Sequence, residues 1–184
     1  MRRDSHYYQA TKDAQEDARQ GIHRTQAEVE VDAKRCRRAE LVTKLASLAH
    51  DDWRSPRKIE GFNRYEPRIK KVKDQGWIER HNGQTEVDIA NTSYTELPSE
   101  WQAENKVSAE IAMDGVLKAV KEGLSLDNAF VEKIADALHV GWVQRNGSWA
   151  AEELKKPYAE LPESEKEKDR YFVRRAIEIY QYYQ

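Results

Sequence analysis

Four stretches of the chain place apolar residues three, four and seven positions apart, the spacing of one buried helical face. They run from about Glu40 to Trp53, between Pro98 and Gly123, from Asn128 to Trp142, and from about Pro162 to Tyr182. We therefore predict a mainly α-helical fold. The predicted core positions are Leu41, Leu45, Leu48, Ala49, Ala109, Ala112, Met113, Val116, Leu117, Val120, Phe130, Ile134, Ala137, Leu138, Trp142, Phe172, Ala176, Ile179 and Tyr183.

Residues that start or stop helices stand at the ends of these stretches. Pro56 follows the first stretch, and proline inside a helix would remove a backbone donor. Pro98 suits the first position of the second helix, where the missing N–H costs nothing. Gly123 suits a C-cap, and Ser125 to Asp127 precede the third helix as an N-cap.

The middle of the chain carries a turn signal between two short apolar runs. Gly76-Trp77-Ile78 and Val87-Asp88-Ile89 flank Asn82-Gly83. Asn-Gly favours the tight turn of a β-hairpin. We predict a short hairpin here, so that short β or loop elements lie between the helices.

The first 40 residues differ from the rest in having no wide apolar face. From about Tyr8 to Arg38 the chain is rich in good helix formers, but its apolar residues are small and poorly phased. Two interpretations stay open. Residues 1–40 form a partly frayed surface helix or tail, or they form a helix that docks on a partner or on a second copy of this chain, giving a homo-oligomer.

Two sequence blocks occur twice, which indicates an internal duplication. A helix with the pattern His-x-x-Trp contains His50 and Trp53, and recurs 89 residues later. A helix start with the pattern Tyr-x-Glu-Leu-Pro begins at Tyr94, and recurs 64 residues later at Tyr158. The first copy therefore holds 25 more residues between its two blocks than the second.

The second copy resembles the RyR domain, a small repeat of ryanodine receptors and of stand-alone bacterial and phage proteins. The family motif runs His-x-x-Trp, Gly-Trp, and then Pro-Tyr-x-x-Leu-x-x-x-Glu-Lys-x-x-Asp-Arg. The matching residues are His139, Trp142, Gly147, Trp149, Pro157, Tyr158, Leu161, Glu165, Lys166, Asp169 and Arg170. Ser148 stands between Gly147 and Trp149, which departs from the family's Gly-Trp. In the first copy, Trp101-Gln102 and Asn105-Lys106 replace Glu-Lys and Asp-Arg, so that copy is divergent.

The resemblance implies an organisation in three parts. Residues 1–40 form a charged N-terminal helix or tail, residues 41–124 a divergent RyR-like repeat, and residues 125–184 a second RyR-like repeat. Each repeat is expected to be a pair of helices joined by a loop that carries a Trp and a Tyr. We also expect Asp169 to hydrogen-bond to the opening helix of its repeat or to His139.

Composition narrows the classes of protein. No apolar run approaches the length of a membrane span, and no apolar signal segment follows Met1. A net charge of −2 makes nucleic acid an unlikely partner. The single cysteine, Cys36, excludes an internal disulfide and suits a reducing compartment, so we expect a cytoplasmic protein.

The chain lacks the motifs of common enzymes and metal sites. It has no Gly-rich phosphate loop, no paired-cysteine pattern, no His-Glu-x-x-His and no Gly-x-Ser-x-Gly. Its five histidines are scattered, without a second ligand at metal-binding spacing. We expect no catalytic residue, no metal and no cofactor.

The extra residues of the first copy are strongly basic. From Trp53 to Lys73 there are eight Lys or Arg residues and two Glu residues, with Phe62 and Tyr65 among them. Such a segment is either a solvated loop or a site for phosphate groups. We predict that it is an inserted loop that is not needed to close the fold, and that Arg68, Lys70, Lys71 and Lys73 bind an anionic partner.

Aromatic residues supply the candidate ligand site. Flat rings such as nucleotide bases stack on Trp and Tyr, although the same residues commonly hold small helical repeats together. We predict a noncatalytic small-ligand protein, of nucleotide-binding type, that senses or sequesters a nucleotide signal. The alternative is a structural or protein-interaction protein without such a ligand. The candidate ligand-binding residues are Trp53, Arg68, Lys70, Lys71, Lys73, Trp77, Tyr94, His139, Trp142, Trp149 and Tyr158.

Overall fold

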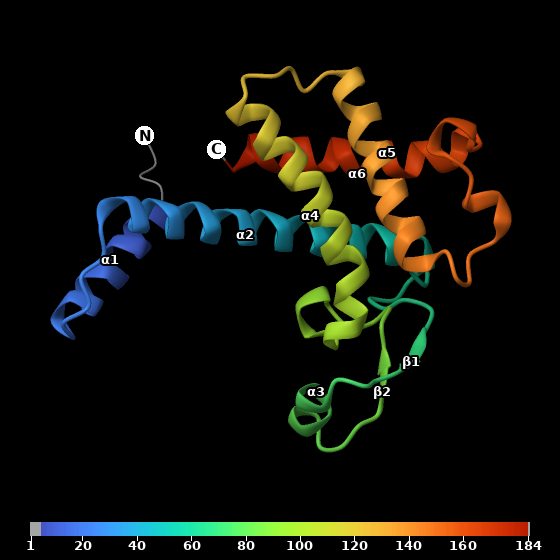
Figure 1. Ribbon diagram of the computed structural model, residues 1–184. Coiled ribbons are helices and arrows are strands. Elements are labelled where there is room, and N and C mark those ends of the chain that lie inside the picture. The colour runs from blue at the N-terminus through green and yellow to red at the C-terminus, as the bar shows by residue number, and fades with distance from the viewer. Residues whose placement is uncertain (1–4, 184) are drawn as a thin grey trace. The chain divides into compact units, whose positions relative to one another are not determined.

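The computed structural model describes residues 5–183 and is mainly helical, as predicted (Figure 1). The chain divides into two compact units, an N-terminal unit of Met1–Leu41 and a C-terminal unit of Val42–Gln184. The predicted boundary between residues 124 and 125 lies inside the C-terminal unit, where helices from both predicted repeats pack on one another.

The N-terminal unit holds two helical segments where the sequence predicted one. Helix α1 spans Ser5–Arg19, and α2 (Gln26–Arg54) begins after a turn in which Gly21 has a φ of +81°. The Thr25 hydroxyl accepts from the Glu28 backbone N–H, and the Glu28 carboxylate accepts from the Thr25 N–H. This capping box starts a new helix at a place where amino-acid propensity alone favoured continuation.

Small side chains form the core of the N-terminal unit. Ala10 of α1 packs with Val29 and Ala33 of α2, and Ala14 covers them. Arg24, in the turn, forms ion pairs with Asp17 at 2.6 Å and with Asp32. Three of the poorly phased alanines of residues 1–40, Ala10, Ala14 and Ala33, thus pack within this unit.

The C-terminal unit is built from the end of α2 together with α4 (Ser99–Lys121), α5 (Asn128–Asn146) and α6 (Glu163–Tyr182). Helices α4, α5 and α6 contact one another pairwise. The Asp127 carboxylate accepts from the Phe130 N–H and caps α5, and Gly123 has a φ of +68° after α4, as predicted. Pro98 stands at the N-cap of α4, one position earlier than predicted.

Two glycines allow α4 and α5 to approach closely. A Cβ at Gly115 of α4 would lie 2.7 Å from Ile134 Cδ1 on α5. A Cβ at Gly141 of α5 would lie 2.7 Å from Ile111 Cδ1 on α4. Each isoleucine therefore packs over a glycine of the facing helix, and this reciprocal contact fixes where the two helices meet.

The buried face of α5 and the end of α6 differ from the prediction. Ala137 is exposed, whereas Val131 and Ala135 are buried beside the correctly predicted Leu138. On α6 the buried residues include Val173, and Tyr183 lies exposed just after the helix. The apolar residues of α5 are spread widely enough around the helix that spacing alone did not select the buried face.

The predicted hairpin is wrong in its pairing. Residues Gln75–Arg80 form a short helix, α3, because the Asp74 carboxylate accepts from the Trp77 N–H and caps it. Asn82 and Gly83 do make a turn with positive φ. However, strand β2 (Glu86–Asp88) pairs antiparallel with β1 (Ile69–Lys71), which precedes α3.

The basic segment from Trp53 to Lys73 contains β1 and is bonded to its neighbours. This corrects the prediction that the segment is only an inserted loop. Asn91 donates to the Tyr65 carbonyl and accepts from the Tyr65 N–H. The Trp101 indole donates to the Lys71 carbonyl at 3.0 Å. These bonds use backbone atoms of the segment and tie it to the turn after β2 and to α4.

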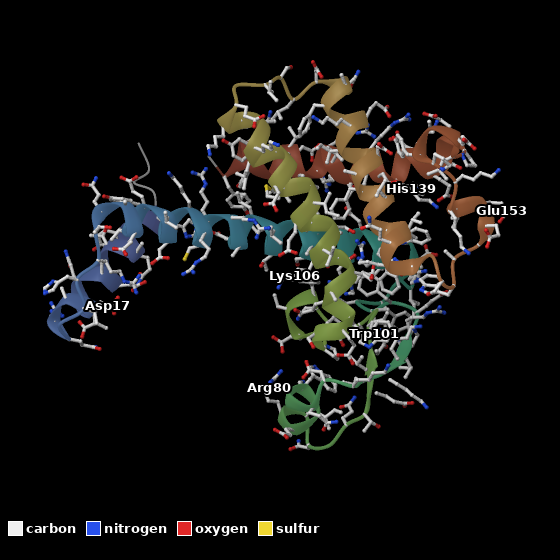
Figure 2. All side chains as sticks on the ribbon, in the orientation of Figure 1. Asp17, Arg80, Trp101, Lys106, His139 and Glu153 are labelled. Carbon is white, nitrogen blue, oxygen red and sulfur yellow. The ribbon has the colours of Figure 1, made fainter. Side chains whose placement is uncertain are left out.

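The two histidines of the repeated blocks have nearly the same surroundings. His50 Nε2 lies 3.0 Å from the Thr92 carbonyl oxygen, and its ring lies 6.4 Å from the Tyr94 ring at 50°. His139 Nε2 lies 2.8 Å from the Lys156 carbonyl oxygen, and its ring lies 6.3 Å from the Tyr158 ring, also at 50° (Figure 2 labels His139 on α5). Thr92 and Lys156 are also 64 residues apart.

The backbone follows the same path after each of these histidine contacts. The tyrosine begins a 3₁₀ turn, Tyr94–Glu96 or Tyr158–Glu160, and a proline then precedes the next helix. The φ and ψ angles are −55° and 149° at Pro98, and −54° and 146° at Pro162. Local backbone geometry is therefore repeated in the two sequence blocks.

Candidate functional site

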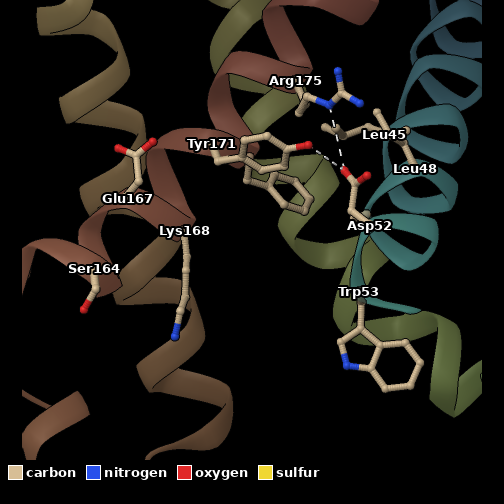
Figure 3. Close-up of a pocket in the computed structure, with 11 residues that line it drawn as sticks. Leu45, Leu48, Asp52, Trp53, Ser164, Glu167, Lys168, Tyr171 and Arg175 are labelled. Carbon is tan, nitrogen blue, oxygen red and sulfur yellow. Dashed lines mark hydrogen bonds and ion pairs between the residues drawn. The ribbon is translucent and has the colours of Figure 1, made fainter. Parts of the chain in front are cut away.

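A cavity of about 550 Å³ lies between the end of α2 and the first half of α6 (Figure 3). Its floor is apolar and is formed by Leu45, Leu48, Ala49 and Phe172. Small-ligand sites usually occupy roughly 300–1,000 Å³, with mostly apolar walls and a few polar groups. This cavity matches that description in volume and lining.

One wall of the cavity is a polar network across the two helices. The Tyr171 hydroxyl donates to the Asp52 carboxylate at 3.0 Å, and Arg175 Nε lies 3.8 Å from the same carboxylate. Arg175 also pairs with Glu178 at 2.7 Å. Burial, followed by the bond to Asp52, raises the pKa of Tyr171, so its hydroxyl stays a donor at neutral pH.

The mouth of the cavity holds an aromatic ring and charged groups. Trp53 stacks on His50, with ring centroids 5.7 Å apart, and carries the Arg57 guanidinium 4.5 Å from its ring. Figure 3 shows Glu167 and Lys168 on α6 across from Trp53. A flat ligand in the cavity would meet the indole on α2 and a cation on α6.

His139 and Trp142 line a different cavity, about 220 Å³ in volume, between α5 and α6. Asp169 lines it as well. The hydrogen bond predicted from Asp169 to His139 or to the opening helix does not form among residues 5–183. His139 instead bonds to the Lys156 carbonyl.

Three of the predicted ligand-binding aromatics are buried and hydrogen-bonded. Trp77 is 4% exposed, donates to the Glu96 carbonyl at 2.9 Å and stacks on His81. Tyr94 is 4% exposed and donates to the Gln102 carbonyl. Tyr158 is 7% exposed and donates to Glu132 at 2.9 Å, and burial together with this bond raises its pKa to about 12.

Of these three side chains, Trp77 lines a described cavity. It borders a polar cavity of about 380 Å³ at the junction of α3 and α4, together with Arg80 and His81. Tyr94 and Tyr158 are buried as residues that hold helices together would be, which was the alternative to ligand binding. The predicted aromatics therefore do not converge on one site.

The remaining predicted residues lie away from the α2–α6 cavity. Trp149 is 71% exposed and meets only the edge of Trp142 among the described rings. Lys70 lies 5.3 Å from the Trp101 ring. Arg68, Lys71 and Lys73 have exposed side chains beside β1.

The sequence interpretation missed most of the residues that line the α2–α6 cavity. Tyr171 and Arg175 are four residues apart on α6, and Asp52 precedes Trp53 on α2, so neither helix alone shows that these side chains meet. A tyrosine and an arginine on one helical face were the only available signal. Their partner Asp52 lies 119 residues from Tyr171 and could not be paired without the fold.

Two searches of the described residues give negative findings. Within residues 5–183 no group of three or more His, Cys, Asp or Glu side chains could hold a metal ion. In the same part of the chain no helix combines the length and apolar character needed to cross a bilayer.

Comparison with known proteins gave no match. No family model, no curated protein and no solved structure matches the chain. The resemblance to the RyR domain therefore still rests on the motif residues alone.

Proposed function

We propose that this protein is a noncatalytic small-ligand-binding protein, and that its ligand is a nucleotide or a similarly flat, anionic molecule. The observation that carries the proposal is the α2–α6 cavity, whose apolar floor and polar wall suit a ring with polar substituents. Such a protein would sense or sequester a nucleotide signal in the cytoplasm.

The chemistry of the cavity supports binding rather than catalysis. Its carboxylate Asp52 already accepts from Tyr171 and faces Arg175, so it is held in place by neighbours. These groups can orient a ligand by hydrogen bonding. The apolar floor supplies contact area, and Lys168, which pairs with Glu165, has further N–H groups that can donate to an anionic substituent.

We also propose that residues 41–124 and 125–184 are RyR-like repeats, the first one divergent. The supporting observation is the repeated arrangement of histidine, carbonyl and tyrosine around His50 and His139. In both copies the histidine and tyrosine rings meet at 50°. The tyrosine and the carbonyl that faces the histidine are each displaced by the same 64 residues between the copies, as a duplication would require.

The alternative function, a structural or interaction protein without a small ligand, is favoured by a separate observation. Trp77, Tyr94 and Tyr158 are buried and use their polar atoms within the fold. Residues 1–40 stay a candidate for self-association, since Val31 is 63% exposed on α2. Sedimentation of the full chain at several concentrations tests that point.

The test of ligand binding is a thermal-shift screen against adenine nucleotides and cyclic nucleotides, followed by calorimetry. A ligand at 100 times its dissociation constant should add about 2.7 kcal/mol to the free energy of unfolding. The Trp53→Ala variant should weaken binding by about tenfold or more, because stacking contributes roughly 1–3 kcal/mol per base. An Ala49→Leu variant, which fills the floor, should do the same.

The matched control is Trp149→Ala, which removes the same ring from an exposed position outside the cavity. This variant should bind as the unmodified protein does. A flat screen, or equal losses in the Trp53 and Trp149 variants, would favour the structural alternative. Loss of binding only when Arg68, Lys70, Lys71 and Lys73 are replaced together would move the site to the basic segment.

A further inference from the structure

The smaller cavity between α5 and α6 differs from the α2–α6 cavity in size and chemistry. At about 220 Å³ it is below the usual range for nucleotide-sized ligands. Its apolar surface comes from Trp142, Leu154 and Leu161, and its polar groups are His139, Glu165, Lys168 and Asp169. Only a molecule of about one ring would fit.

The charges in this cavity are unequally compensated. Lys168 Nζ lies 2.7 Å from both carboxylate oxygens of Glu165, so those two charges offset each other. The Asp169 carboxylate receives no hydrogen bond from residues 5–183. Burial raises the pKa of Asp169 to about 6, although the nearby His139 acts in the opposite direction.

His139 cannot supply the missing donor in its neutral form. A neutral imidazole carries one N–H. Because Nε2 faces the Lys156 carbonyl at 2.8 Å, that nitrogen must be the donor, and Nδ1 then has no proton to give. The Asp169 carboxylate is thus left ionised at neutral pH in a half-buried cavity, where a cation would be stabilised.

Trp142 provides the second recognition element. Its half-buried ring lines the cavity, while its contact with Trp149 is edge to face at 6.1 Å. An indole attracts organic cations, and Leu154 and Leu161 can contact the apolar part of a ring.

We propose that the α5–α6 cavity is a second ligand site, which takes a single-ring organic cation such as an aryl amidinium or an aryl ammonium. The cation pairs with Asp169, and the ring lies against Trp142 and the two leucines. This site does not depend on the proposed function of the α2–α6 cavity, although Lys168 lines both cavities. In the first repeat block Asn105 stands where Asp169 stands in the second, so the first block has no equivalent carboxylate.

The test uses benzamidine and its neutral analogue benzamide, titrated into the full chain by calorimetry and by ¹H–¹⁵N NMR at pH 7.5. Benzamidine should bind at least about tenfold more tightly than benzamide, since only the amidinium compensates the carboxylate. Asp169→Asn should abolish this preference. The matched control Asp136→Asn, which removes an exposed carboxylate from α5, should leave it unchanged.

The pH dependence has a defined sign. As the pH falls from 7.5 to 5, Asp169 takes up a proton and loses its attraction for the cation. The other titratable or charged groups facing Asp169 are His139, Glu165 and Lys168. Benzamidine binding should therefore weaken on acidification, while binding of benzamide should not change.

A second variant keeps the test decisive if Asp169→Asn perturbs the fold. Leu154→Trp adds bulk from the loop before α6 and should block benzamidine. The Trp53→Ala variant should leave benzamidine binding intact, which separates this site from the proposed nucleotide site. Equal binding of benzamidine and benzamide, no binding of either, or unchanged binding in both cavity variants would overturn the proposal.

Discussion

The two repeated blocks of the C-terminal unit share a histidine arrangement but differ in what the following helix adds. In both, a buried histidine bonds to a loop carbonyl and lies beside a tyrosine of a 3₁₀ turn. In the second block Arg170 pairs with Glu132 at 2.6 Å and with Glu163, and Asp169 lines a cavity. In the first block Trp101 instead holds β1.

This difference teaches which residues build the scaffold and which give it chemistry. The histidine and tyrosine join a helix to the next loop, so the same pair appears wherever the backbone takes this path. The residues of α4 and α6 that point away from that junction are free to differ. The second block uses them for charged groups, and the first uses them to secure an added strand.

The largest expected effect is the removal of either histidine. His50→Ala and His139→Ala should each lower the free energy of unfolding by about 2–3 kcal/mol, because a loop carbonyl loses its donor and a ring is lost from the core. Urea unfolding measures both. The control His23→Ala changes an exposed residue and should stay within about 0.5 kcal/mol.

Equal effects in the two histidine variants would sharpen the comparison, since they would show that both junctions stabilise the unit alike. A large loss of stability for His139→Ala together with almost none for His50→Ala would show that the two histidine sites are not equivalent.

The next effect is on the pH dependence of stability, and it comes from the second block alone. The folded pKa of Asp169 is about 6, above its ordinary value of 3.8. Between these values the folded protein keeps a proton that the unfolded chain has released. This group therefore makes stability fall as the pH rises from about 4 to about 6.

Asp169→Asn should remove that slope and raise stability at pH 7 by about 1–2 kcal/mol, allowing for partial solvent screening. Melting temperatures of both proteins between pH 4 and 8 measure the difference. If the Asn variant is less stable than the original at pH 7, Asp169 has a bonding partner and the contrast with Asn105 loses its meaning.

A smaller effect distinguishes the two tyrosines. Tyr158→Phe loses a 2.9 Å bond to Glu132, whereas Tyr94→Phe loses only a 3.4 Å contact with the Gln102 carbonyl. We expect a cost of about 1 kcal/mol for the first and less than about 0.5 kcal/mol for the second. Chemical denaturation of the two Phe variants gives both numbers. The reverse order would contradict this assignment of the bonds.

The smallest effect concerns the basic segment of the first block. Replacing Arg68, Lys70, Lys71 and Lys73 together with Ala should change stability by less than about 1 kcal/mol, because backbone atoms hold β1 in place. The main loss is the contact of Lys70 with Trp101. Unfolding of the quadruple variant would show that these side chains, rather than the strand pairing, secure the segment.

Much of the helical framework could be predicted because it depends on local signals. Pro56, Pro98, Gly123 and Asp127 mark helix ends through backbone restrictions that act within a few residues. The break before α2 was missed, although the capping box at Thr25 was present in the sequence. The high helix propensity of this stretch favours one continuous helix, whereas the reciprocal bonds of Thr25 and Glu28 start a second one.

The strand pairing and the cavities could not be predicted in the same way. Asn82-Gly83 signalled a turn, but Val87 pairs with Lys70 in the neighbouring strand, and Lys70 precedes α3 in the sequence. For the site, the sequence identified Trp53 yet gave no means of placing it opposite Lys168 and Tyr171. Three of the aromatic residues predicted to bind a ligand, Trp77, Tyr94 and Tyr158, are buried in the core.

By itself the sequence determined the four helices with an apolar face, several of their ends, and the repetition of the histidine and tyrosine blocks, because these follow from spacing and from short-range backbone chemistry. Only the tertiary structure decided which side chains share a cavity. It brought Asp52 to Tyr171 across 119 residues, buried Tyr94 and Tyr158, and placed Asp169 in the cavity between α5 and α6. Burial and long-range pairing depend on how helices cross, and that is set by contacts such as those of Gly115 and Gly141, which no local pattern specifies.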